Sequence, residues 1–184
     1  MATITILGAG GWGTALAVMA NRHGHTVTLW SPFEDEIESI RRHGQHKKLL
    51  PDIPVEPSIH LTCDMRDASC ADLVILAVPS FAVASTAEKL RPFLKPGTIV
   101  ANAGKGLEEN TFRRFTQVIE ATLPGVSAVA LSGPSHAEEV GRGIPTVVVS
   151  ASKDKAVAKT VQDILMNPTF RIYTREDVIG VELG

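Results

Sequence analysis

Three glycines near the amino terminus have the spacing of a phosphate-binding loop. Gly8, Gly10 and Gly13 directly follow the apolar run Thr3–Leu7, and small apolar residues follow them. In a strand–loop–helix unit, the first glycine permits a tight turn and the second lets a pyrophosphate approach the backbone. The third lets the helix pack on the strand, and free N–H groups at the positive helix end face the phosphates. The motif predicts a dinucleotide site; the alternative is a tight turn without a ligand.

A lysine flanked by glycines follows a later predicted strand. Lys105 lies between Gly104 and Gly106, which leave space around its ammonium group. Because the carboxyl ends of parallel strands meet at one edge of a sheet, we expect Lys105 near the glycine loop. There it could polarise a carbonyl, bind a phosphate or hold a hydroxyl in place. The alternative is a solvated loop lysine.

Two more strand ends contribute candidates to the same edge. Pro79 ends an apolar run and predicts a flat wall beside a cofactor, although it also suits the start of a helix. Ser135 is expected to cap the helix that follows it, with Glu138 as its capping-box partner. We expect His136 to pack beside this cap rather than to act as an acid or base. No histidine spacing predicts a metal site.

Strand-like and helix-like stretches alternate, which predicts a Rossmann-like, doubly wound α/β fold with a mostly parallel sheet and right-handed crossovers. Most inner strands are continuous apolar runs, as expected for strands buried on both faces. The predicted strands are Thr3–Leu7, Thr26–Trp30, Ile59–Thr62, Leu73–Val78, Thr98–Asn102, Ala128–Leu131, Thr146–Ser150 and Phe170–Tyr173. The predicted helices are Thr14–His23, Pro32–His43, Phe81–Leu90, Thr111–Thr122, Ser135–Val140 and Asp154–Met166.

Local signals predict how the first two helices begin and end. Gly24 has the position of a left-handed cap after the first helix. Ser31, Pro32 and Glu34 read as an N-cap, a proline at the first helical position and a capping-box glutamate. The proline-rich stretch Gly44–Ser58 is expected to be an irregular loop.

The second strand ends without the acidic residue that commonly holds the adenosine ribose of NAD. Ser31 stands there instead, and a serine can bind a 2′-hydroxyl or tolerate a 2′-phosphate. Positive charge for a 2′-phosphate is available from Arg41, Arg42, Lys47 and Lys48. Opposing negative charge comes from Glu34, Asp35 and Glu36. The balance favours NADP slightly and leaves NAD open.

Composition narrows the class of protein. Hydrophobic residues make up 44% of the sequence, which is ordinary for a globular protein. The formal net charge is −2, and no stripe of basic residues indicates a nucleic-acid partner. No apolar run is long enough to cross a bilayer, and no signal-peptide pattern opens the chain. Cys63 and Cys70 are too few for a disulfide framework. We therefore expect a cytoplasmic protein.

The end of the sequence predicts a domain boundary. Residues 1–175 are expected to form the NAD(P)-binding domain, and residues 176–184 to begin a helix that leads into an absent helical domain. That helix stops with no C-terminal cap and with no partner for its apolar residues. The alternative is a short, frayed terminus.

Taken together, these motifs resemble the bacterial-type NAD(P)-dependent glycerol-3-phosphate dehydrogenases. The glycine loop alone is shared by many dehydrogenases, whereas the later motifs in this order are more specific. The resemblance is carried by Gly8 to Ala17, Ala77-Val78-Pro79-Ser80, Lys105-Gly106-Leu107-Glu108, Leu131 to Ala137, Gly143-Ile144-Pro145-Thr146 and Asp177 to Gly184.

The resemblance implies an oxidoreductase that interconverts dihydroxyacetone phosphate and sn-glycerol 3-phosphate for glycerophospholipid synthesis. With the glycine loop, it implies cofactor contacts from Gly8, Gly10, Gly11, Trp12, Gly13, Ser31, Pro32, Phe33, Pro79, Lys105 and Ala137. It implies substrate contacts from Lys105, Gly133 and Ser135. Lys105 is then the residue that orients the substrate, and no metal is required.

The sequence departs from the family pattern at three places. Gly11 stands where many members carry serine, and Leu49 replaces a tyrosine. The family's proton-acceptor lysine lies beyond Gly184, as does the helical domain through which the full-length proteins are expected to form homodimers. The 184-residue chain is therefore expected to bind the cofactor without turning over.

Two other functions fit the same glycine loop. One is a different dehydrogenase of this layout, acting on a 2-hydroxy acid. The other is a non-catalytic NAD(P)-binding sensor, which would not need the proton-acceptor lysine.

Overall fold

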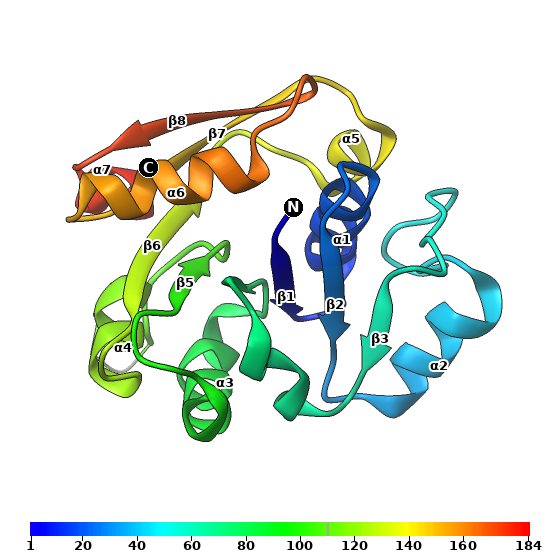
Figure 1. Ribbon diagram of the computed structural model, residues 1–184, viewed down its shortest axis with the longest axis horizontal. Coiled ribbons are helices and arrows are strands. Elements are labelled where there is room, and N and C mark those ends of the chain that lie inside the picture. The colour runs from blue at the N-terminus through cyan, green and yellow to red at the C-terminus, as the bar shows by residue number, and fades with distance from the viewer. Residues whose placement is uncertain (110) are drawn as a thin grey trace.

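One eight-stranded sheet organises the protein in the computed structural model, which describes residues 1–109 and 111–184 (Figure 1). The strand order is β3-β2-β1-β4-β5-β6-β7-β8, and all neighbours are parallel except the antiparallel pair β6 and β7. The strands are β1 (Thr3–Leu7), β2 (Thr26–Trp30), β3 (His60–Thr62), β4 (Leu73–Leu76), β5 (Ile99–Asn102), β6 (Ser127–Ser132), β7 (Thr146–Ala151) and β8 (Phe170–Arg175).

Helices cover both faces of this sheet because its central strands are apolar on both sides. In β1, Ile4 and Ile6 belong to the core beneath α1, whereas Leu7 belongs to the core beneath α3 and α4. The helices are α1 (Gly11–Arg22), α2 (Glu34–His43), α3 (Val83–Leu90), α4 (Phe115–Thr122), α5 (Ala137–Arg142), α6 (Lys155–Leu165) and α7 (Val178–Leu183). The predicted Rossmann-like, doubly wound fold is confirmed. No helix in the described part of the chain has the length and apolar character needed to cross a membrane.

The start of α2 differs from the predicted capping box. The helix begins at Glu34, its N-cap is Phe33, and no side chain caps it. The Ser31 hydroxyl accepts a hydrogen bond from the backbone N–H of Phe33 at 3.2 Å and donates to Glu36 at 2.5 Å. Ser31 is therefore used to order the turn before the helix, and the capping prediction was wrong.

Two other helix starts also differ. The N-cap of α5 is His136 without a side-chain cap bond, so the predicted Ser135 capping box was wrong. Helix α4 starts at Phe115 rather than Thr111, because Phe112 has a φ of +54° and Arg114 pairs with Leu107 in an isolated bridge. By contrast, the left-handed turn at Gly24 is confirmed by its φ of +85°.

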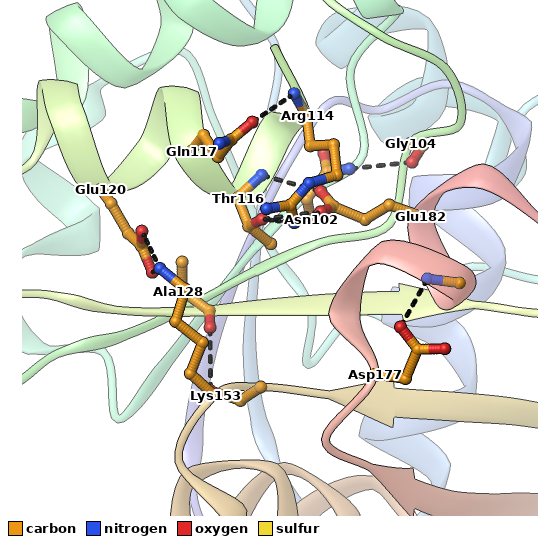
Figure 2. Close-up of polar contacts among 12 residues, drawn as sticks. Asn102, Gly104, Arg114, Thr116, Gln117, Glu120, Ala128, Lys153, Asp177 and Glu182 are labelled. Carbon is orange, nitrogen blue, oxygen red and sulfur yellow. Dashed lines mark hydrogen bonds and ion pairs between the residues drawn. The ribbon is translucent and has the colours of Figure 1, made fainter.

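Helix α7 is anchored to the sheet through part of its apolar face, so the expectation that its apolar residues lack a partner holds only for the exposed Ile179 and Leu183. Val178 is buried with Ala130 and Ala151. The Glu182 carboxylate accepts hydrogen bonds from Arg114 Nη1 at 2.6 Å and from the backbone N–H of Thr116 at 2.8 Å (Figure 2). Because only 3% of the Glu182 side chain is exposed, this ion pair is largely shielded from water.

Replacing Glu182 by alanine should lower the free energy of unfolding by about 2 kcal/mol, because it leaves the Arg114 guanidinium and the Thr116 N–H without their acceptor in a buried place. Urea denaturation followed by circular dichroism measures the change. The exposed Glu176, replaced by alanine, is the matched control and should change the value by less than about 0.5 kcal/mol. Equal effects from both variants would contradict this account of α7.

Candidate functional site

Two glycines are required where β1 turns into α1. Gly8 has a φ of +116°, and a Cβ there would lie 2.6 Å from the carbonyl oxygen of Ala77. A Cβ on Gly13 would lie 1.9 Å from the carbonyl oxygen of Gly8. A side chain at Gly8 would push the turn away from the end of β4, and one at Gly13 would push α1 away from the turn. These two glycines therefore set how closely the amino end of α1 approaches β1 and β4.

Gly10, between them, meets a different environment. A Cβ built on Gly10 has no heavy atom within 4 Å, so the space beside this backbone is open. Gly10 is also the N-cap of α1, which has neither a side-chain cap nor an acidic residue in its first turn. The first N–H groups of a helix have no partner within the helix. Together with the helix dipole, they make this open space suited to an anion.

A cavity of about 500 Å³ lies over this helix end. Its wall combines the glycine loop with the ends of β2, β4 and β5, at the carboxyl edge of the sheet where doubly wound folds bind ligands. It is lined by Gly8, Ala9, Gly10, Gly11, Trp12, Trp30, Ser31, Pro32, Phe33, Glu36, Leu49, Ala77, Val78, Pro79, Phe81, Ala82, Thr86, Ala103 and Gly104.

A smaller cavity of about 250 Å³ shares Trp12 and Ala103 with the larger one. It is formed where the loop after β5 faces the loop after β6. Its other lining residues are Lys105, Leu131, Ser132, Gly133, Ser135, His136 and Ala137. The Lys105 ammonium lies 3.4 Å from the carbonyl oxygen of Gly133, which joins the two loops by a hydrogen bond.

The structure thus divides the predicted site residues between two adjoining cavities. The larger cavity holds Gly8, Gly10, Gly11, Trp12, Ser31, Pro32, Phe33 and Pro79, and the smaller one holds Lys105, Gly133, Ser135 and Ala137. Gly13 lines neither cavity and acts through helix packing. Asn102 supports the lysine loop (Gly104–Gly106), because its buried side-chain amide donates to the carbonyl of Gly104 at 2.8 Å (Figure 2).

Two residues that line the larger cavity were not among the predicted site residues. Phe81 is 74% exposed and lines the cavity, as do the aromatic residues Trp12, Trp30 and Phe33. Leu49 comes from the irregular 44–58 loop, and a Cβ on Gly11 would lie 2.7 Å from its carbonyl oxygen. Because Gly11 has no side chain, this loop can pack against the start of α1.

Of the three acidic residues that the sequence set against a 2′-phosphate, the structure places Glu36 alone in the lining of the larger cavity, beside the end of β2. The Oε2 atom of Glu36 accepts a hydrogen bond from Ser31 Oγ at 2.5 Å, and its Oε1 lies 3.3 Å from His46 Nε2. Nδ1 of His46 accepts from the backbone N–H of Leu49, so Nε2 carries the hydrogen that reaches Glu36. Among residues 1–109 and 111–184, no group of His, Cys, Asp and Glu is arranged to hold a metal.

Comparison with known proteins gives a consistent result. Residues 3–158 match the family model described as the NAD-dependent glycerol-3-phosphate dehydrogenase N-terminus. The chain is 47% identical over its whole length to a glycerol-3-phosphate dehydrogenase [NAD(P)+] of Desulfitobacterium hafniense, of which it covers 52%. It is 50% identical to the corresponding protein of Moorella thermoacetica, with 99% of this chain and 54% of that protein covered.

A solved structure shows the same arrangement. The crystal structure of glycerol-3-phosphate dehydrogenase from Coxiella burnetii superposes with a TM-score of 0.92 at 34% identity, covering 98% of this chain and 56% of that one. The chain therefore spans about half the length of the relatives it matches. A ketopantoate reductase from Ralstonia eutropha, at 20% identity and a TM-score of 0.73, shares the fold.

Alanine at Gly13 and at Gly10 should have different effects on stability. Gly13→Ala should lower the free energy of unfolding by about 2–3 kcal/mol, because the new Cβ collides with backbone at Gly8. Gly10→Ala should change it by less than about 1 kcal/mol, because the Cβ enters open space. Parallel urea denaturation of both variants measures this difference. A Gly10→Ala protein as unstable as Gly13→Ala would contradict the open cavity.

Proposed function

The chain belongs to the NAD-dependent glycerol-3-phosphate dehydrogenase family, as its amino-terminal domain, and we propose that it binds NAD or NADP for interconversion of dihydroxyacetone phosphate and sn-glycerol 3-phosphate. Because the chain spans about half the length of its relatives, the reaction is proposed for a full-length protein that contains this domain. Residues 1–175 would bind the nucleotide, and residues 176–184 would begin the connection to a second domain.

The observation that carries this proposal is the uncapped amino end of α1 at the larger cavity. A pyrophosphate needs several donors and a close approach to backbone, and Gly10 offers both because no side chain stands before the helix. The cavity of about 500 Å³ is in the range of small-molecule and cofactor sites. The residues present therefore fit a dinucleotide.

Each part of the cofactor can be matched to residues that line the two cavities. Ser31, Pro32 and Phe33 would hold the adenosine side, because they follow β2, the strand that carries the ribose-binding residue in Rossmann folds. Pro79 would form a wall along the middle, and Ala137 would border the other end through the smaller cavity. When bound, the cofactor supplies the hydride exchanged with the substrate.

The smaller cavity would receive the substrate. Lys105 provides a positive charge between two loops, and its hydrogen bond to the Gly133 carbonyl keeps the ammonium beside Ser135. An ammonium in this place can hold the oxygen atoms of a phosphorylated ketone and stabilise the negative charge that develops on its carbonyl oxygen. Lys105 would thus orient the substrate, while Gly133 and Ser135 shape the wall around it.

Direct binding tests the nucleotide site in the 184-residue chain. Both tryptophans, Trp12 and Trp30, line the larger cavity, so NADH or NADPH should quench their fluorescence in a saturable manner. Gly10→Ala should weaken the tighter nucleotide at least about tenfold while the protein stays folded, because its Cβ occupies the approach to the pyrophosphate. Unchanged affinity in folded Gly10→Ala, or no saturable binding by the parent chain, would contradict the proposal.

Loss of Lys105 should affect chemistry more than cofactor binding. In a full-length protein that contains this domain, Lys105→Ala should lower kcat/KM for dihydroxyacetone phosphate by about 100-fold or more, through lost stabilisation of developing charge. The dissociation constant for the nucleotide should change by less than about fivefold. Steady-state kinetics and calorimetry separate the two effects, with the exposed Lys95→Ala as control. A Lys105→Ala enzyme with normal kcat/KM would rule out this role.

A further inference from the structure

Glu36 gives the larger cavity its charge. Of the described residues that line this cavity, Glu36 is the single one with an ionisable acidic or basic side chain. A glutamate is ionised at neutral pH under ordinary conditions. The wall of the cavity next to the end of β2 therefore carries one negative charge and no compensating cation from its own lining.

Two hydrogen bonds fix this carboxylate where it is. Ser31 Oγ donates to one oxygen at 2.5 Å, and His46 Nε2 lies 3.3 Å from the other. His46 is buried, with 8% of its side chain exposed, and is itself held by the backbone N–H of Leu49. Glu36 keeps 24% of its side chain exposed and lines the cavity, while the contacts with Ser31 and His46 set its orientation.

The nearby arginine and lysine side chains that could attract a 2′-phosphate lie outside the larger cavity. Arg41 pairs with Glu38 and donates to the carbonyl of Leu61 at 3.0 Å, which holds it at β3, and it does not line the cavity. Arg42, Lys47 and Lys48 are exposed to solvent and do not line the cavity. The positive charges counted in the sequence are thus not part of the cavity wall.

Resting on the proposed nucleotide binding, we propose that Glu36 selects NAD(H) over NADP(H) by facing the adenosine ribose. A carboxylate accepts hydrogen bonds from a ribose hydroxyl, as the acidic residue after the second strand does in NAD-binding Rossmann folds. Toward a 2′-phosphate the same carboxylate is repulsive and has no donor to offer. Glu36 does this from the first turn of α2, five residues beyond Ser31, instead of from the strand end itself.

Calorimetric titration of the 184-residue chain with NADH and with NADPH tests this selection. The parent chain should bind NADH at least about tenfold more tightly than NADPH. Glu36→Gln keeps the shape and removes the charge, and should reduce this ratio at least about fivefold, mainly by strengthening NADPH binding. Glu34→Gln is the matched control, because it removes an exposed charge from the same helical turn outside the cavity. It should leave the ratio unchanged.

The outcomes separate this inference from the proposed function. No binding of either nucleotide would overturn the proposed function, and the inference with it. Binding of both with equal affinity, or a preference for NADPH, would overturn the inference alone, as would a Glu36→Gln protein whose two affinities fall in parallel. If Glu36→Gln does not fold, competition on the parent chain decides: AMP should displace NADH more effectively than adenosine 2′,5′-bisphosphate, and the reverse order would overturn the inference.

Discussion

The close approach of α1 to β1 is the constraint on which the rest of the site depends. Gly13 allows the helix to lie against the backbone of Gly8, and Gly8 in turn lies against Ala77 of the neighbouring strand end. Only with this contact does the uncapped end of α1 open toward the carboxyl edge of the sheet. The two missing Cβ atoms thus let the uncapped start of α1 and the open space beside Gly10 lie against the ends of β1 and β4.

The 44–58 loop packs against the start of α1 and so forms part of the larger cavity next to the end of β2. Its Leu49 carbonyl fits against Gly11, and the same short stretch contains His46, which contacts Glu36. Glycine at position 11 thus permits a loop position that also supports the carboxylate. A buried histidine and a serine at a strand end, neither of which would bind the ligand by charge, together hold the charged group that faces it.

Sequence patterns were sufficient for the sheet and the glycine loop, because burial on both faces and fixed glycine spacing are local signals. They failed at two helix starts, because the Ser31 and Ser135 hydroxyls bond to other nearby groups, Glu36 and the carbonyl of Gly133, instead of capping the helix. They named Glu36 only together with Glu34 and Asp35, since a contact between a strand end and the next helical turn has no characteristic spacing that would select one of the three. The lysine loop was located correctly because its strand is parallel to its neighbours, which places Lys105 at the same sheet edge.

The central claim is that the backbone N–H groups at the start of α1 receive the pyrophosphate of a nicotinamide dinucleotide. Titration of the ¹⁵N-labelled chain with NADH, followed by amide chemical shifts, tests it most directly. The amide signals of Gly10, Gly11, Trp12 and Gly13 should shift most, with saturation at one equivalent of NADH. Shifts concentrated elsewhere, such as the groove between α2 and the loop before β3, with these four amides unmoved, would contradict it.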